Sequence, residues 1–136
     1  MKKKEPGGSR TEAQEQKSVV KWAEDPKTQT IHPELKALFY VGNQSTWRSG
    51  SAEARKYGSI ANAMGRKKGV PDLCLPIPKG GKSGLWIEMK TKDGKISEHQ
   101  HEYFQLLANY GHVIIIARSD IEAIDAIISY LEPGSP

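Results

Sequence analysis

The residues of this chain whose types and spacing suggest chemistry are Asp72, Glu88 and Lys90. The segment LWIEMK has the pattern of a strand. Because successive side chains of a strand point to opposite faces, Glu88 and Lys90 are expected on the same face. Asp72 begins the apolar segment DLCLPI, and the glycine-rich connection PKGGKSG between the two segments suits an antiparallel hairpin. Neighbouring strands lie about 5 Å apart, so the sequence predicts that Asp72 lies close to Glu88.

Two neighbouring carboxylates and a lysine are groups that metal-assisted hydrolysis of a phosphodiester can use. The carboxylates repel each other unless a cation lies between them, and oxygen ligands without thiolate or clustered histidine favour Mg²⁺ or Mn²⁺ over zinc. The lysine can orient or help to deprotonate an attacking water, and it can stabilise negative charge developing on the phosphate. The first expected helix offers a further acid at Glu12 or Glu15. Glu15 is preferred because it shares the core-facing stripe with Val19 and Trp22.

Each of these residues also has a structural explanation when it is taken alone. Asp72 follows Pro71 and can belong to a turn, while Glu88 and Lys90 can form a weak ion pair on a solvated face. Acids in the first turn of a helix are favoured by the helix dipole in any protein. The combination of two acids and a lysine on adjacent strands favours a functional site over these separate explanations.

Hydrophobic periodicity and capping signals place the predicted site on a sheet that helices flank. The expected elements are a helix over 11–25, a strand in ALFYV, a helix over 51–64, strands in DLCLPI and LWIEMK, a helix over 97–110, a strand in VIIIA and a helix from 119. This order, αβαββαβα, predicts an α/β fold with a mixed β-sheet. The unbroken run VIIIA is typical of a strand covered on both faces. The apolar stripes expected on the last two helices are Tyr103, Leu106, Leu107 and Tyr110, and Ile121, Ile124, Ile127, Ile128 and Leu131.

Length and composition indicate one folded domain with short polar ends. The 136 residues fit a single core, which we place at 11–132, with a disordered basic arm at 1–10 and a flexible tail at 133–136. The single cysteine, Cys74, excludes an internal disulfide, and no apolar run is long enough for a membrane span. We therefore expect a soluble protein of the cytoplasm, without a membrane partner.

The net charge of +4 is less informative than its distribution. Between residues 48 and 68 the only acid is Glu53, and the basic residues there are Arg48, Arg55, Lys56, Arg66, Lys67 and Lys68. The segment GRKKG directly precedes the strand that begins with Asp72, so its three cations would lie beside a phosphate bound at the site. Arg48, Arg66, Lys67 and Lys68 are the predicted DNA-binding residues, although a solvated helix and loop would also explain them.

The pattern Pro71-Asp72 followed by Glu88-Met89-Lys90 resembles the PD-(D/E)xK nuclease superfamily. Within that superfamily, GVPDLCLP, GLWIEMK and the following ISEHQ look like the VRR-NUC family in its small standalone form found in phages and bacteria. The similarity covers roughly residues 11–131 and implies a restriction-endonuclease-like fold.

The resemblance also implies roles for individual residues. Asp72 and Glu88 would bind the metal with help from the Met89 carbonyl, Lys90 would be catalytic, and Glu15 or Glu12 would add an acid from the first helix. Gln100 matches a polar family position and is predicted to be a further catalytic residue, although a glutamine three residues after Ser97 is also expected as part of a capping box. Arg118, at the end of the last expected strand, has no assigned role.

The sequence thus predicts a Mg²⁺- or Mn²⁺-dependent, structure-specific endonuclease that hydrolyses branched DNA such as four-way junctions. Relatives of the standalone type look like homodimers, and two-fold pairing would supply the two opposed cuts that a junction requires. A flap or nicking nuclease is the nearest alternative within enzymes. A non-catalytic module that binds branched DNA is the alternative from another class.

Overall fold

The computed structural model describes residues 10–42 and 52–134. The elements are α1 (Glu12–Glu24), α2 (Pro26–Ile31), the 3₁₀ helix η1 (Pro33–Ala37), β1 (Phe39–Tyr40), α3 (Ala52–Ala63), β2 (Leu73–Leu75), β3 (Leu85–Met89), α4 (Glu98–Asn109), β4 (Val113–Ala117) and α5 (Asp120–Leu131). Every expected element is present, and α2 and η1 are two further short helices between the first expected helix and the first expected strand. The Asp25-Pro26 pair that ends α1 also starts α2, because the Asp25 side chain accepts a hydrogen bond from the Lys27 N–H at 2.8 Å.

The four strands form one mixed sheet in the order β1-β2-β3-β4. β2 pairs antiparallel with both β1 and β3, while β4 runs parallel to β3. The predicted hairpin is confirmed, with Leu73 opposite Ile87 and Cys74 opposite Trp86. When this register is continued by one residue, Asp72 falls opposite Glu88. The fold is therefore an α/β fold consistent with restriction-endonuclease-like domains.

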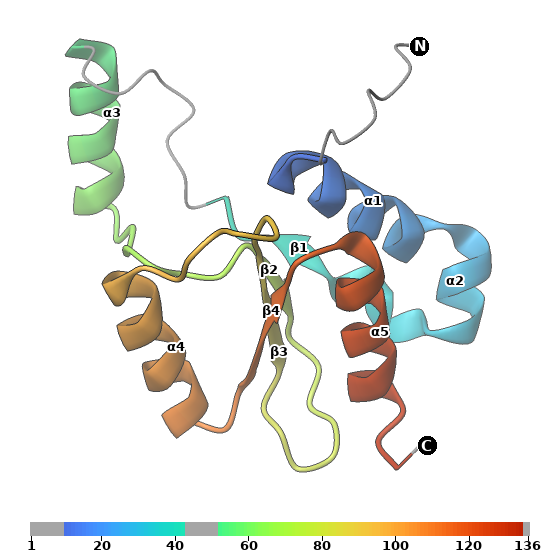
Figure 1. The fold of residues 1–136 in the computed structure, drawn as a ribbon. Coiled ribbons are helices and arrows are strands. Elements are labelled where there is room, and N and C mark those ends of the chain that lie inside the picture. Colours follow the sequence, from blue (N-terminus) through green and yellow to red (C-terminus); the bar gives the residue numbers. More distant parts are fainter. Residues whose placement is uncertain (1–9, 43–51, 135–136) are drawn as a thin grey trace, which may run out of the picture.

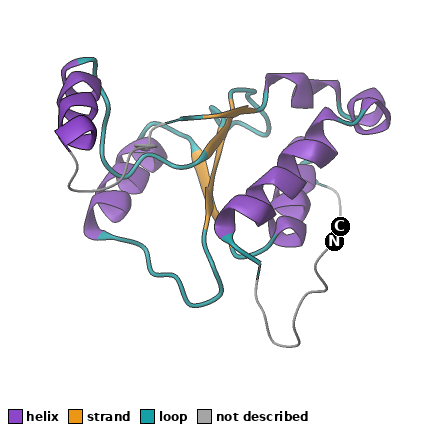
Figure 2. Ribbon diagram, turned by 90° about the horizontal axis from the view of Figure 1, so that it is seen from above, coloured by secondary structure: helices purple, strands orange, loops and turns teal. Residues whose placement is uncertain are grey.

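Helices cover both faces of the sheet, with α1 and α5 on one side and α4 on the other (Figure 1). Figure 2 shows the same layers from above, with the strands between the two groups of helices. The main core lies between the sheet and the α1/α5 layer, where Val19, Ile87 and Ile127 are fully buried. Successive side chains of a strand point to opposite faces. Glu88 therefore lies on the face of β3 that is turned away from this core.

The predicted environment of β4 and the predicted stripe of α4 are wrong in part. As expected, β4 contacts helices on both faces, α4 on one and α5 on the other, but it lies at the edge of the sheet and Ile116 is 38% exposed, so its cover is incomplete. In α4 the buried residue is Phe104, whereas Leu106 and Tyr110 are exposed. The run of β-branched residues reports strand propensity, and it does not report the position of a strand within a sheet.

In α5 the buried residues include Ile127 and Leu131, as expected, but Ile121 is 67% exposed because it lies in the first turn, at the rim of the core. α3 extends away from the sheet (Figure 1). Arg48 and most of the expected N-terminal arm lie outside the described residues. Within 10–42 and 52–134, no helix is both long and apolar enough to span a bilayer.

Candidate active site

β2 begins at the end of the sheet where β3 finishes. Asp72 and Glu88 lie side by side at this end. The Asp72 carboxylate accepts a hydrogen bond at its Oδ2 from the Met89 N–H at 2.8 Å, and the Asp72 carbonyl accepts another from the Val41 N–H at 2.8 Å. Glu88 is buried, with 4% of its surface exposed, and its Oε2 lies 3.9 Å from Lys90 Nζ. The structure therefore brings the three predicted residues together.

Asp72 disfavours the ionisation of Glu88. Burial, followed by the charge of Asp72, raises the pKa of Glu88 to about 8, although the nearby Lys90 ammonium opposes this rise. Burial also raises the pKa of Asp72, against the hydrogen bond from the Met89 N–H. Within the described part of the chain, Glu88 Oε1 is buried without a hydrogen-bond partner. A cation between the carboxylates would relieve both the repulsion and the unpaired oxygen.

The chemistry of these donors fits a hard divalent ion. Asp72 and Glu88 would be the carboxylate ligands of such an ion, and in the described ranges no group of three or more His, Cys, Asp or Glu side chains could hold a metal ion. Mg²⁺ is commonly held by one or two carboxylates together with water and substrate phosphate oxygens. Met89 is placed between Glu88 and Lys90, and the ligand role of its carbonyl stays a prediction.

Of the two helix-one acids, the structure brings Glu12 rather than Glu15 to this centre. Glu12 Oε1 accepts a hydrogen bond from the Thr91 N–H at 3.3 Å, and the charge of Glu12 contributes to the raised pKa values of Asp72 and Glu88. Glu12 lies in the first turn of α1, where the helix passes the end of β3.

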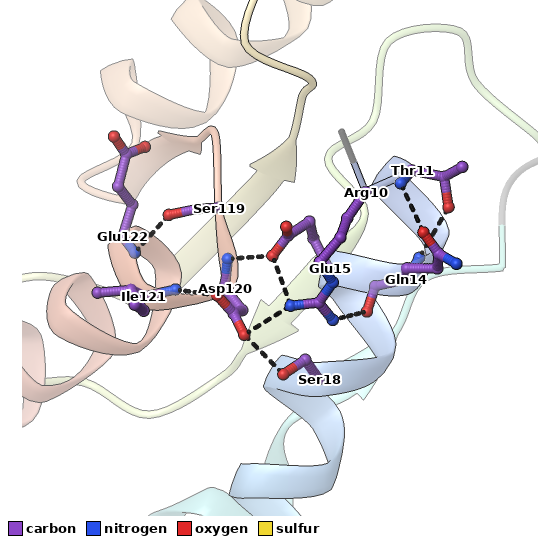
Figure 3. Close-up of polar contacts among 9 residues, drawn as sticks. All are labelled: Arg10, Thr11, Gln14, Glu15, Ser18, Ser119, Asp120, Ile121 and Glu122. Carbon is purple, nitrogen blue, oxygen red and sulfur yellow. Dashed lines mark hydrogen bonds and ion pairs between the residues drawn. The ribbon is translucent and has the colours of Figure 1, made fainter. Parts of the chain in front are cut away.

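Glu15 is used instead at the junction between α1 and α5 (Figure 3). Its Oε2 accepts a hydrogen bond from the Asp120 N–H at 2.7 Å and lies 3.5 Å from Arg10 Nη1. Asp120 in turn accepts a hydrogen bond from the Ser18 hydroxyl at 2.7 Å. Glu15 faces inward, as expected. However, the turn of α1 that carries Glu15 meets the start of α5 and not the acidic pair.

A cleft of about 410 Å³ contains the acidic pair, Lys90 and the predicted DNA-binding run Arg66, Lys67 and Lys68. Arg66 Nε donates to Asn62 Oδ1 at 3.0 Å, which ties this arginine to the end of α3. The cleft therefore combines carboxylates with several cations, as a phosphate-binding nuclease site requires.

Gly69 holds the basic run against the start of α4. Its φ of +86° is in the left-handed region, and a Cβ atom there would lie 2.3 Å from the His99 carbonyl oxygen. Only glycine satisfies both conditions. The sequence pattern Gly-Val-Pro was recognised as part of the resemblance, and the structure gives its first residue a physical reason.

Gln100 lines the cleft and also forms the predicted capping box. Its Oε1 accepts from the Ser97 N–H at 2.8 Å, and its own N–H donates to Ser97 Oγ at 3.2 Å. The structural explanation is thus confirmed, while a catalytic role stays a prediction. Sequence reasoning missed Tyr40, Lys95 and His99, which also line the cleft. Lys95 and His99 adjoin recognisable motifs, but Tyr40 had no signal besides its aromatic ring.

The comparisons with known proteins agree with the fold and with the predicted family. The sequence profile of the VRR-NUC domain matches residues 10–120. The chain belongs to the VRR-NUC family. No curated protein matches the sequence. A solved structure described as a VRR_NUC domain protein is similar with a TM-score of 0.70 and 27% identity, covering 91% of this chain and 90% of that chain. The resemblance predicted from the sequence is confirmed, and this VRR-NUC chain carries a nuclease-type domain, which suggests DNA binding.

Proposed function

We propose that this VRR-NUC domain is a Mg²⁺- or Mn²⁺-dependent endonuclease that hydrolyses phosphodiester bonds in branched DNA, with four-way junctions as the substrate class. The observation that carries the proposal is the buried pair Asp72 and Glu88 beside Lys90, within a cleft that several cations also line. A purely structural pair of acids would leave a buried oxygen of Glu88 unpaired at a cost in stability.

Asp72, Glu88 and the Met89 carbonyl would hold the ion. When bound, the ion would make a water molecule more acidic and offset charge on the leaving oxygen. Lys90 lies close enough to Glu88 to orient the attacking water and to stabilise negative charge on the phosphate oxygens. Glu12, in preference to Glu15, would add a negative charge beside the acidic pair and fix the backbone that follows Lys90.

The DNA backbone would be held by the basic run that shares the cleft. Arg66, Lys67 and Lys68 are supplied by the segment directly before the Asp72 strand, so their charges and the acidic pair are brought together by one stretch of chain. Each phosphate contact releases counterions, and binding should therefore weaken as salt rises. Arg48 would extend this basic surface.

The proposal includes a homodimer that acts in the cytoplasm of a bacterial or phage-infected cell. One domain offers one such cleft, whereas resolution of a four-way junction needs two opposed cuts. Two-fold pairing places two identical sites in a fixed relation. Sedimentation that finds only monomers, with and without junction DNA, would contradict the paired arrangement.

The test is a cleavage assay on matched substrates that share one sequence: a four-way junction, a flap, a nicked duplex and an intact duplex. We expect junction cleavage with Mg²⁺ or Mn²⁺, and loss of product with EDTA or with Asp72→Ala. Glu24→Gln, which changes an exposed acid on α1, is the matched control and should cleave normally. Preferred cutting of the flap or nicked duplex would replace the junction substrate. Tight DNA binding without product under all metal conditions would identify a binding module instead.

A further inference from the structure

Arg118, the residue that follows β4, contacts the turn that follows β3. Its Nη1 donates hydrogen bonds to the carbonyl oxygens of Thr91 at 2.8 Å and Gly94 at 2.5 Å, with the Lys92 carbonyl at 3.4 Å. Gly94 N–H also donates to the Thr91 carbonyl at 3.1 Å and closes the turn. A single guanidinium group thus holds both ends of the 91–94 turn with charge-assisted hydrogen bonds.

Both residues that flank this turn line the cleft with Asp72 and Glu88. Lys90 precedes the turn and Lys95 follows it. The Lys90 N–H donates to the Ala117 carbonyl at 2.9 Å, directly before Arg118, and this bond is where the pairing between β3 and β4 ends. Beyond that bond, the 91–94 turn is held by its own backbone hydrogen bond between Gly94 and Thr91 and by contacts made by side chains.

Thr91 is held from two sides by such contacts. Glu12, from α1, accepts a hydrogen bond from the Thr91 N–H at 3.3 Å, while Arg118 donates to the Thr91 carbonyl. Lys92 and Asp93 are exposed and Thr91 and Gly94 are half-buried, so the turn lies at the surface, where water can reach it once Arg118 is removed. Removal of the guanidinium should therefore reduce the order of the turn more than the stability of the fold.

We propose that Arg118 is a positioning residue of the nuclease site. By fixing the 91–94 turn, it keeps Lys90 beside Glu88 and brings Lys95 into the cleft as a further residue that contacts a DNA phosphate. This inference rests on the proposed function, because it assigns a support to the same reaction.

The experiment combines amide hydrogen exchange of the free protein with single-turnover cleavage of junction DNA at saturating protein. Arg118→Ala should speed exchange in the 91–94 turn with little change in melting temperature. It should lower the cleavage rate about 10- to 100-fold, since a misplacement of about 1 Å at a reacting group has effects of this size. Arg118→Lys keeps the charge and N–H donors, and it should restore part of the rate. Arg10→Ala is the matched control, because Arg10 makes comparable contacts at the α1–α5 junction.

Lys95 is tested by binding and not by turnover. Lys95→Ala should weaken junction binding measured in EDTA and reduce the salt slope by about one, as the loss of one phosphate contact predicts. Lys92→Ala, which changes an exposed lysine of the turn that is not among the residues lining the cleft, is its matched control.

Three results would overturn the inference. Unchanged exchange at the turn in Arg118→Ala would show that the turn is held without Arg118. A loosened turn with wild-type cleavage would show that Lys90 does not depend on it, and an unaltered salt slope in Lys95→Ala would remove the phosphate contact. A wild-type protein without any nuclease activity would refute the proposed function instead, and the exchange measurement would still decide whether Arg118 fixes the turn.

Discussion

Replacement of Glu88 by glutamine should make the metal-free protein more stable. Glu88 is 4% exposed and lies beside Asp72, and burial raises its pKa from the ordinary value of 4.5 to about 8. One pKa unit corresponds to about 1.4 kcal/mol, so the carboxyl group costs at most about 3 kcal/mol at pH 7 relative to the unfolded chain. An amide carries no such cost but also needs hydrogen-bond partners, and we therefore expect a gain of about 1–3 kcal/mol in the free energy of unfolding.

The sign of the pH dependence follows from the direction of the shift. Between pH 4.5 and about 8 the folded protein binds more protons at Glu88 than the unfolded chain does, so wild-type stability falls as pH rises through this window. The stability advantage of Glu88→Gln should therefore be small near pH 4.5, grow with pH and level off above about pH 8.

The assay is urea unfolding followed by circular dichroism in EDTA, repeated from pH 5 to 9 and then with Mn²⁺ or Mg²⁺. Added metal at about 100 times its dissociation constant should stabilise the wild type by about 2.7 kcal/mol and leave Glu88→Gln almost unchanged. Glu24→Gln, an exposed control, should stay within about 0.5 kcal/mol of the wild type. The reasoning would be refuted if Glu88→Gln were less stable than the wild type in EDTA at pH 8, or if both proteins gained equally from metal.

Four further substitutions test the remaining parts of the interpretation. Lys90→Ala should cleave about 10²- to 10⁴-fold more slowly while binding junction DNA in EDTA like the wild type, as measured by single-turnover kinetics and gel shift; equal losses of binding and cleavage would contradict a role in chemistry. Glu12→Gln should lower the cleavage rate more than the melting temperature, whereas Glu15→Gln should lower the melting temperature and spare cleavage; the opposite pattern would restore Glu15 to the site. Gly69→Ala should destabilise the fold by about 1–3 kcal/mol in urea unfolding, because its Cβ would lie 2.3 Å from the His99 carbonyl oxygen at a positive φ, and a neutral result would mean that this approach can relax.

The parts of the fold that could be predicted from the sequence are those that local contacts determine. The capping boxes of Thr11 with Gln14 and of Ser97 with Gln100 are formed by residues three positions apart, and both are present in the structure. The hairpin between β2 and β3 follows from its glycine-rich connection and the alternation of its strands. Because the register follows from the hairpin, the meeting of Asp72 and Glu88 was also within reach of the sequence.

The edge position of β4 was not within reach of the sequence, because it depends on the order of the strands in the sheet. VIIIA has the same composition whether it lies in the centre or at the edge, and the strand order of the folded sheet places it at the edge. The role of Arg118 was hidden for a related reason. Its hydrogen-bond partners lie 24–27 residues away, and they are main-chain carbonyls, which no side-chain pattern reveals.

The choice between Glu12 and Glu15 shows most clearly where periodicity stops being informative. Residues three apart in a helix lie on the same face, about one turn from each other, so any stripe that includes Glu15 also admits Glu12. The two acids differ in the element that their turn of α1 contacts. The first turn of α1 passes the end of β3, where Glu12 accepts from the Thr91 N–H, and the next meets the N-terminus of α5, where Glu15 accepts from the Asp120 N–H. Each carboxylate is satisfied by a main-chain donor that only tertiary structure supplies. The position of α1 relative to the sheet therefore decides which acid lies beside Asp72 and Glu88. The contrasting effects expected for Glu12→Gln and Glu15→Gln test this placement.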